Sequence, residues 1–209
     1  EKIRVGTRSR IATTTDEKIL KFMLWKLYEV YVFYLVVALL REKGYWVDKS
    51  KGCHLAKKGE REICIVMNRD LNTSRLHEVD SLSDVSRLRG RPDISLYNRE
   101  VILFECKYSD DVGYITAGRF KAMAYAFEYD PLTVVLAYPG ISEGGEPYDD
   151  EEEETAKLDE VAKREGYVDF KFRDREGKVK VIYMARLDPL KDNEENVRIL
   201  EKVLSTYLD

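Results

Sequence analysis

The segment that most constrains the fold is Arg91–Tyr108, RPDISLYNREVILFECKY, which the sequence predicts to be a β-hairpin. Asp93–Tyr97 and Val101–Tyr108 are rich in residues that favour strands, and Asn98-Arg99-Glu100 between them is typical of a turn. The turn folds the first strand onto the second. The chain therefore needs a sheet in which this hairpin can be buried.

Charged side chains interrupt the second strand of this hairpin. Because strand side chains alternate between two faces, Glu105 and Lys107 are predicted to share one face. Phe104 and Cys106 take the other face. Asp93 opens the first strand, so the hairpin brings its carboxylate near Glu105. Two carboxylates and one lysine are thus expected to converge in an otherwise apolar region.

Burying charge in a core strand costs several kcal/mol per ion unless a partner compensates it. The expected partner is Mg²⁺, with Mn²⁺ able to substitute, because Mg²⁺ binds one or two protein carboxylates and bridges to phosphate. Asp93 and Glu105 would hold the metal. Lys107 would orient or help deprotonate a water molecule, or offset charge on a phosphate. The alternative is an exposed hairpin in which Glu105 and Lys107 form a solvated ion pair of little energetic value.

The order Pro92-Asp93 followed by Glu105-x-Lys107 resembles the motif of the PD-(D/E)xK nuclease superfamily. Later residues are similar to McrC, the family of nuclease subunits of McrBC-type modification-dependent restriction systems, and to related uncharacterised nucleases. The resemblance covers about Thr14–Gly140 and includes Lys107-Tyr108, Lys121-Ala-Met-Ala-Tyr125 and Ala137-Tyr138-Pro139. Two positions depart from the family pattern: Lys121 replaces the usual glutamine, and Glu105-Cys106 replaces the commoner Asp-Ala.

This resemblance implies an α/β fold with a restriction-endonuclease-like core, a mixed central β-sheet flanked by helices in the order αβββαβ. It also implies a Mg²⁺-dependent DNA endonuclease. Asp93, Glu105 and the backbone carbonyl of Cys106 would be the metal ligands, Lys107 would act on the attacking water, and Lys121 would contact DNA phosphate. The rival hypothesis is a catalytically inactive module of the same fold that binds DNA or serves assembly.

A long helix is predicted before the hairpin, beginning at the capping box Thr14-Thr15-Asp16-Glu17 and ending at Gly44. It is almost wholly apolar beyond its first turns, so a membrane span has to be considered. Lys26 and Glu29 interrupt the apolar stretch, and the uninterrupted run Val30–Leu40 is too short to cross a bilayer. We therefore expect a buried core helix and no membrane partner.

Glu29 is the informative residue of this helix, because an acid inside a buried stretch needs a compensating partner. Many PD-(D/E)xK nucleases carry a glutamate on the helix beside the active-site sheet. By that resemblance, Glu29 would support the site or hold a second metal, with its carboxylate on the same side of the sheet as Asp93 and Glu105. The alternative is a glutamate that pairs with a neighbouring lysine or arginine.

The cysteines constrain the redox setting. Cys53, Cys64 and Cys106 are an odd count without CxxC spacing, which argues against a disulfide framework and against a zinc ribbon. We therefore expect a reducing, cytoplasmic location. His54 and His77, the two histidines, are predicted to be structural or surface residues rather than metal ligands.

The net charge of −4 looks unfavourable for a protein that binds nucleic acid. The six consecutive acids of Asp149–Glu154 account for more than this whole charge, so the remainder of the chain is basic. Arg87, Arg89 and Arg91 lie directly before Asp93, where DNA phosphate contacts would be useful. With these few bases, DNA affinity is expected to be weak and strongly salt-dependent.

The chain contains no GxxxxGK[ST] phosphate-binding loop, so it is not expected to hydrolyse nucleoside triphosphates itself. By the resemblance, recruitment would come from a GTP-driven AAA+ subunit of McrB type. The alternative is a stand-alone nuclease that forms a homodimer, whose second copy completes a basic groove.

The remaining elements extend one predicted domain, 1–209, with a core of about 14–140. Glu1–Thr13 is predicted to be an irregular lead-in, Asp70–Gly90 a loop, and Glu143–Glu154 an exposed acidic loop. Strands are predicted at Tyr45–Asp48, Cys53–Lys57, Glu62–Asn68, Val168–Arg173 and Lys178–Ala185, and a further strand, Leu132–Tyr138, parallel to the one that bears Glu105. Helices are predicted at Tyr114–Tyr129, Thr155–Gly166 and Asn193–Leu208.

Overall fold

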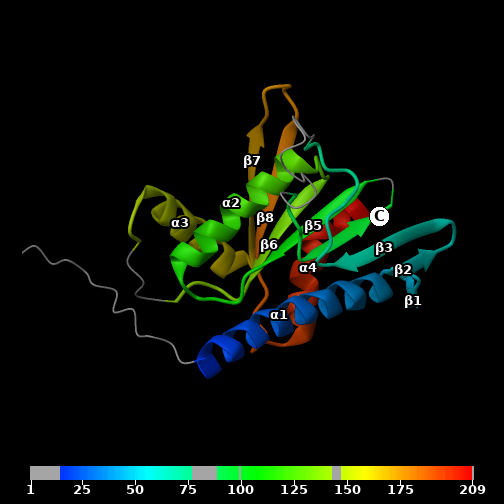
Figure 1. Ribbon diagram of the computed structural model, residues 1–209, viewed down its shortest axis with the longest axis horizontal. Coiled ribbons are helices and arrows are strands. Elements are labelled where there is room, and N and C mark those ends of the chain that lie inside the picture. The colour runs from blue at the N-terminus through cyan, green and yellow to red at the C-terminus, as the bar shows by residue number, and fades with distance from the viewer. Residues whose placement is uncertain (1–14, 77–88, 99, 143–146, 209) are drawn as a thin grey trace, which may run out of the picture.

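The computed structural model describes residues 15–76, 89–98, 100–142 and 147–208. These residues form an α/β fold in which a mixed eight-stranded sheet is flanked by helices, as expected (Figure 1). The helices are α1 (Thr15–Glu42), α2 (Val112–Glu128), α3 (Asp150–Glu165) and α4 (Asn193–Leu208). The strands are β1 (Trp46–Ser50), β2 (Cys53–Lys58), β3 (Arg61–Met67), β4 (Ile94–Tyr97), β5 (Val101–Cys106), β6 (Thr133–Tyr138), β7 (Tyr167–Arg173) and β8 (Val179–Arg186).

The sheet has the order β1-β2-β3-β4-β5-β6-β8-β7. Its first five strands form an antiparallel meander, whereas β5, β6 and β8 run parallel to one another and β7 pairs antiparallel with β8. The predicted parallel strand after the hairpin is confirmed, with Glu105 in register with Leu136. The carboxyl ends of three neighbouring strands therefore meet at one edge, where α/β sheets commonly bind ligands.

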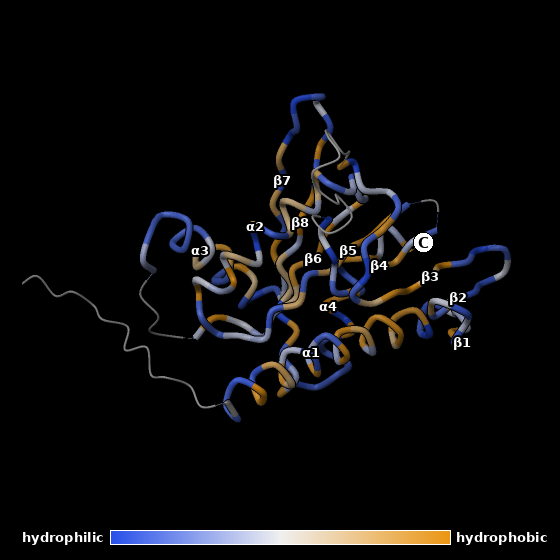
Figure 2. Tube along the Cα trace, viewed as in Figure 1, coloured by the Kyte–Doolittle hydropathy of each residue, from blue (hydrophilic) through white to orange (hydrophobic). Residues whose placement is uncertain are grey.

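The helices cover the sheet in two layers. Residues of α1 and α4 pack on one face, and residues of α2 and α3 pack on the other. Figure 1 shows α2 across the front of the sheet, α4 behind it and α1 along its lower side. Figure 2 shows the apolar colour concentrated on the central strands and the polar colour at the tips of the β2–β3 and β7–β8 hairpins. The core thus consists of two apolar layers separated by the sheet.

The predicted alternation along the second hairpin strand is confirmed. Phe104 and Cys106 belong to the core layer beneath α1, whereas Leu103 belongs to the layer beneath α2. Glu105, two positions after Leu103, is fully buried. The sheet therefore places a carboxylate inside the protein on the α2 side, and the exposed-hairpin alternative is wrong.

Helix α1 begins and ends where the sequence predicts, and the left-handed backbone of Gly44 follows it at φ 85°. Its second half, from Tyr28 to Leu40, is mostly buried against the sheet and α4. Its first half exposes large apolar side chains, including Leu20, Phe22 and Leu27. By length and hydropathy the stretch Asp16–Glu42 could cross a membrane, and half of its most apolar window is buried. The prediction of a buried core helix is right for the second half and wrong for the first.

Part of the acidic segment is helical, so its prediction as a loop is wrong for Asp150–Glu154. These residues form the first turns of α3, and the side chain of Asp149 caps the helix by accepting from the backbone N–H of Glu152 at 2.9 Å. Acids near a helix N-terminus are stabilised by the helix dipole and by the free N–H groups there. A run of acids therefore favours the start of a helix in this context.

The cysteine prediction is also wrong for one pair, because Cys53 and Cys64 form a disulfide between β2 and β3. Their Cα atoms lie 5.8 Å apart, a separation that suits a disulfide. Pairing of the two strands brings these residues together, which the odd cysteine count could not reveal. The cytoplasmic location therefore stays a prediction that the cysteines no longer support.

His54 packs against the ring of Phe33 with 4.8 Å between ring centroids, which confirms its structural role. The predictions for Glu1–Thr13, for His77 and for Arg87 lie outside the described residues.

Candidate functional site

The two hairpin carboxylates meet at the carboxyl edge of the parallel strands. Asp93 directly precedes β4, which runs antiparallel to β5, and its backbone N–H donates to the carbonyl of Phe104 at 3.0 Å. One side-chain oxygen, Oδ2, accepts from the backbone N–H of Cys106 at 2.7 Å. Asp93 is therefore fixed opposite Glu105 by the strand pairing itself, as the hairpin prediction requires.

Glu105 is the most enclosed charge of the site. Its Oε1 atom accepts from Lys107 Nζ at 2.5 Å and from Lys121 Nζ at 3.0 Å. Lys121 Nζ also lies 2.9 Å from Oε2, but without hydrogen-bond geometry, so Oε2 is buried with no hydrogen-bond partner. Oε2 therefore has an ammonium group beside it but no well-aligned donor, so a further cation or donor could still be stabilised there.

Asp93 shows the same need for positive charge. Burial raises its pKa, and the negative charges of Glu105 and Glu29 raise it further against the opposing hydrogen bond from Cys106, to about 7. Lys121 lowers this pKa, but with the smallest of these effects. Two carboxylates that share one enclosed site resist simultaneous ionisation unless a cation binds between them.

Lys107 directly follows β5, and its side chain packs against α2. Burial alone would lower its pKa, but the charge of Glu105 and the hydrogen bond to it raise the pKa overall. Its ammonium group lies 5.0 Å from the ring centroid of Tyr114. Its aliphatic stem fits against Gly118, where a Cβ atom would come within 2.8 Å of Lys107 Cγ. Gly118 therefore provides the space that lets Lys107 reach Glu105.

Lys121 enters the site from α2 and remains 44% exposed along its side chain. It thus links the buried Glu105 to solvent, where a bound phosphate could contact it. Its position one turn before Tyr125 agrees with the Lys121-Ala-Met-Ala-Tyr125 pattern, since Tyr125 also turns toward the site and donates to the carbonyl of Arg91 at 2.9 Å.

Glu29 approaches the site differently from the prediction. Helix α1 covers the sheet face opposite to Glu105, so Glu29 reaches the site around the strand ends rather than from the same side. Both of its carboxylate oxygens accept from Lys26 Nζ at 2.8 Å, and Oε2 also accepts from the side-chain amide of Asn68 at 2.8 Å. The alternative of a neighbouring lysine is therefore realised. Glu29 still lies close enough to raise the pKa of Asp93.

Asn68 joins these two parts of the site. It follows β3 with a left-handed backbone at φ 53°, a conformation that asparagine tolerates better than most residues. Its backbone N–H donates to the carbonyl of Asp93 at 2.9 Å while its side chain holds Glu29. Because Asn68 contacts both residues, a substitution at Glu29 should alter the position or the pKa of Asp93.

The loop before Asp93 is anchored on the second half of α2. The backbone N–H of Gly90 donates to the carboxylate of Glu128 at 3.0 Å, and the hydroxyl of Tyr129 donates to the carbonyl of Gly90. A Cβ atom at Gly90 would lie 2.8 Å from Glu128 Oε2 and in closer collision with the ring of Tyr125. The position of Asp93 therefore depends on this close approach of the loop to α2.

The predicted DNA-contacting arginines differ in accessibility. Arg91 is exposed, whereas Arg89 is partly buried and its Nε atom has no hydrogen-bond partner. Arg87 lies outside the described residues. Cys106 ends β5, and its thiol is buried with a pKa raised by burial and by Asp93, Glu105 and Glu29. Of the two groups of Cys106, the backbone carbonyl rather than the thiol is therefore the candidate metal ligand.

Within the described ranges, no three side chains of His, Cys, Asp and Glu come together closely enough to hold a metal ion by themselves. The site offers two carboxylates, Asp93 and Glu105, beside the backbone of Cys106. Mg²⁺ commonly uses one or two protein carboxylates and completes its shell with water and substrate phosphate. The orphaned oxygen of Glu105 and the raised pKa of Asp93 both fit such a cation.

Sequence reasoning missed three residues that shape the site, because their contacts join different elements of the fold. The aromatic spacing on α2 could have suggested Tyr114, but nothing in the local pattern marks the other two. The three are Asn68, Tyr114 and Gly118.

Comparisons of the chain with protein-family models, with curated proteins and with solved structures find no match.

Proposed function

We propose that this protein is a Mg²⁺-dependent endonuclease that hydrolyses phosphodiester bonds in DNA. The observation that carries the proposal is the pair of enclosed carboxylates, Asp93 and Glu105, whose negative charge the protein compensates only in part. Two lysines, Lys107 and Lys121, lie within 3.0 Å of the same carboxylate. Metal ligands beside cations at a solvent-facing sheet edge are the requirements of phosphoryl chemistry.

The roles follow from position. Asp93 and Glu105, with the carbonyl of Cys106, would hold Mg²⁺, which when bound activates water and neutralises charge on the phosphate. Lys107 would donate a hydrogen bond to the attacking water and stabilise charge on the phosphate. Lys121, which is more exposed, would bind a non-bridging phosphate oxygen. Water attacks phosphorus, the bond to the leaving sugar oxygen breaks, and the water proton leaves to solvent while the leaving oxygen gains one.

The fold proposal is a restriction-endonuclease-like core. Its support is the sequence of elements around the site: a long helix, the antiparallel β3–β4–β5 strands, then helix α2 and the parallel strand β6. Two further strands, β1 and β2, stand between α1 and β3, and the remaining order corresponds to the αβββαβ pattern implied by the resemblance to PD-(D/E)xK nucleases. Lys121 contacts Glu105, and Tyr125 contacts the carbonyl of Arg91, which supports a role for this part of α2 at the site.

The rival function is an inactive module that keeps the fold for DNA binding or assembly. It draws support from the ion pairs that Lys107 and Lys121 make with Glu105, which give these side chains a structural role. A cleavage assay separates the two. Purified protein is incubated with plasmid, methylated, single-stranded and branched DNA in Mg²⁺, in Mn²⁺ and in EDTA. Metal-dependent cleavage that is lost in Glu105→Gln supports the nuclease.

Intact DNA in every condition, with and without an added NTPase partner, would overturn the nuclease proposal. The matched control is Lys49→Ala, because Lys49 is exposed on β1 at the edge of the sheet away from the parallel strands. This variant should cleave like the wild type.

For recruitment we propose a GTP-driven AAA+ partner of McrB type and a cytoplasmic setting. What supports the partner is the net charge of −4 and the small number of arginines before Asp93. A homodimer with a composite basic groove is the competing arrangement. Solution mass and DNA binding across a salt series decide between them, because a tight homodimer–DNA complex without nucleotide would contradict the need for a partner.

A further inference from the structure

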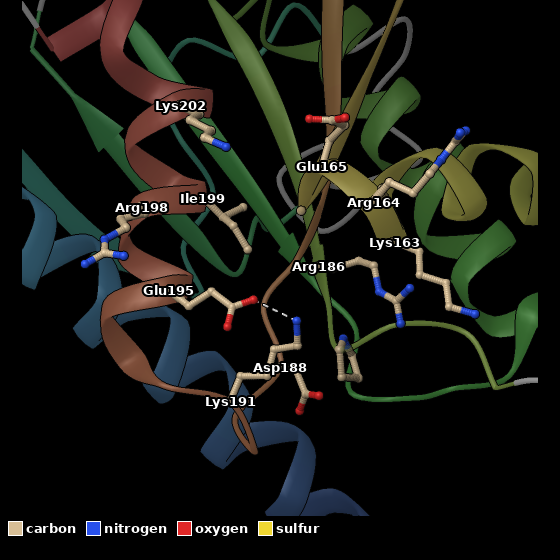
Figure 3. Close-up of a pocket in the computed structure, with 13 residues that line it drawn as sticks. Lys163, Arg164, Glu165, Arg186, Asp188, Lys191, Glu195, Arg198, Ile199 and Lys202 are labelled. Carbon is tan, nitrogen blue, oxygen red and sulfur yellow. Dashed lines mark hydrogen bonds and ion pairs between the residues drawn. The ribbon is translucent and has the colours of Figure 1, made fainter.

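A second feature of the carboxyl edge is a basic pocket between the end of α3, the ends of β6 and β8, and helix α4 (Figure 3). Its volume is about 490 Å³. Three acidic and six basic side chains line it, in a chain whose net charge is negative. The basic residues are Lys163, Arg164, Arg186, Lys191, Arg198 and Lys202.

Some of this positive charge is neutralised within the protein. Lys191 Nζ donates to Glu195 at 2.7 Å, the contact drawn as a dashed line in Figure 3. Lys202 is different: it is exposed, and among the described residues no acid lies within ion-pairing distance of it. Figure 3 shows its ammonium group directed toward the centre of the pocket rather than away from it.

Arg186, at the end of β8, forms the inner wall of the pocket. Its guanidinium packs against Gly140, where a Cβ atom would displace it. Its Nε atom is 3.7 Å from Asp159, but its Nη1 atom is buried and has no hydrogen-bond partner. Arg186 thus leaves one guanidinium donor unsatisfied in the inner wall, while Lys202 presents an exposed ammonium group from α4; this positive charge favours an anionic ligand.

The pocket lies on the same edge as the candidate catalytic site. Glu105 is at the end of β5 and Arg186 at the end of β8, with β6 between the two strands. Two strand spacings amount to about 10 Å. Nearby phosphates of one DNA strand are separated by distances of this order. A strand cleaved at Glu105 could therefore present a later phosphate to this pocket.

We propose that the basic pocket binds a backbone phosphate of the nucleic acid, a few nucleotides from the scissile phosphate, through Lys202. This inference rests on the proposed nuclease function for its ligand, but the pocket can be tested separately. Its role is to fix the path of the strand across the carboxyl edge. It supplies basic charge that the arginines before Asp93 provide only sparsely.

The test measures binding of fluorescently labelled duplex DNA to the full chain in EDTA, across a series of salt concentrations. Lys202→Glu and the milder Lys202→Gln are compared with Lys49→Glu, which reverses an exposed charge at the other side of the sheet. We expect Lys202→Glu to weaken binding about tenfold and to reduce the slope of log affinity against log salt by about one. Lys202→Gln should weaken binding less, and Lys49→Glu should bind like the wild type.

Two further measurements separate the possible outcomes. Hydrolysis of bis(4-nitrophenyl) phosphate should be unchanged in Lys202→Glu, because this small diester does not extend from the catalytic site to the pocket. Equal DNA binding by Lys202→Glu and Lys49→Glu would overturn the pocket proposal even if the enzyme cleaves. A further outcome is that Lys202→Glu loses DNA binding while the wild type hydrolyses no substrate. That outcome would support the phosphate-binding role of the pocket and count against the proposed nuclease activity.

The third measurement uses inorganic phosphate as the probe, with thermal unfolding as the readout. If phosphate stabilises the wild type but not Lys202→Glu, while DNA binding is the same in both, the pocket is a site for free phosphate. That result would overturn its assignment to a DNA strand.

Discussion

Two aspartates at opposite ends of the same sheet show how differently this protein treats enclosed charge. Asp130, just before β6, accepts from Lys178 at 2.7 Å and also contacts Arg75 and Lys180. Burial acts to raise its pKa, but the hydrogen bonds from these lysines outweigh it and lower the pKa overall. At the other end, the pKa of Asp93 is raised to about 7 by burial and by Glu105.

The two sites differ in whether side chains of the protein supply all of the compensating positive charge. Asp130 and the buried Lys180 form a network that the chain completes by itself, with Asp174 as a second acid 3.6 Å from Lys180. Asp93 instead faces Glu105, whose Oε1 accepts from Lys107 and Lys121 but whose Oε2 makes no hydrogen bond, although Lys121 Nζ lies 2.9 Å from it. We interpret the first cluster as structural and the second as a site that awaits an external cation.

The largest expected effect is on catalysis. Lys107→Ala should reduce DNA cleavage by roughly a thousandfold or more, because charge on the phosphate and orientation of the water would both be lost. The affinity for Mn²⁺ should change little, whereas the free energy of unfolding in metal-free buffer should fall, because the buried Glu105 loses one of its two lysine partners. Single-turnover cleavage, urea unfolding and calorimetry measure the three quantities. Equal losses of stability in Lys107→Ala and Asp93→Ala would point to a structural ion pair instead.

Asp130→Asn should destabilise the protein by roughly 3 kcal/mol at pH 7, because it leaves the buried Lys180 short of a partner. The lowered pKa means that Asp130 contributes stability above the unfolded pKa near 3.8, and that this contribution disappears as pH falls through the folded pKa. The cost of the substitution should therefore shrink below pH 4. Urea unfolding at pH 7 and at pH 3.5 checks this, and cleavage per folded molecule should be unaffected.

Asp93→Asn should change the free energy of unfolding in the opposite direction to Asp130→Asn. In metal-free buffer it should stabilise the protein by about 1–3 kcal/mol at pH 8. A raised pKa means that folding disfavours the ionised form, so the wild type loses stability as pH rises from about 4 to 7. Asparagine keeps an acceptor for the Cys106 N–H but carries no charge. Urea unfolding in EDTA at pH 5 and pH 8 should show a gain that grows with pH. A loss of stability at pH 8 would contradict the assignment.

The smallest effect is expected for Glu29→Gln. This substitution removes one of the charges that raise the pKa of Asp93, while glutamine can still accept from Lys26 and Asn68. The pH midpoint of the Asp93 stability effect should fall by less than about one unit. Carboxyl NMR titration of Asp93 in metal-free protein would measure it. An unchanged midpoint would show that the charge of Glu29 does not act on Asp93.

Much of this arrangement could be predicted because it is local. The alternation in Val101–Cys106 determines that Glu105 is enclosed, and the turn at 98–100 determines that Asp93 lies opposite. The Lys121-to-Tyr125 spacing likewise places both side chains on one side of α2. Such features depend on periodicity and turn chemistry, which a sequence displays directly.

The remainder depends on contacts between distant segments. Asn68 meets Glu29 across 39 positions, and Cys53 meets Cys64 only because β2 and β3 pair in one particular register. The exposed first half of α1 could not be predicted, since its apolar residues look the same as those of the buried half. The acidic run was misjudged because its charge suggested a loop, although acids also stabilise a helix start.

The most direct test of the account is metal binding to Asp93 and Glu105, measured by isothermal titration calorimetry with Mn²⁺ and Mg²⁺ in buffers of different ionisation enthalpy. The wild type should bind metal and release about one proton at pH 6, where Asp93 is protonated, and almost none at pH 9. Asp93→Asn should lose most of this affinity, and Asp130→Asn should retain it. No binding to the wild type, or equal binding and proton release in Asp93→Asn, would contradict the claim that this pair is a cation site.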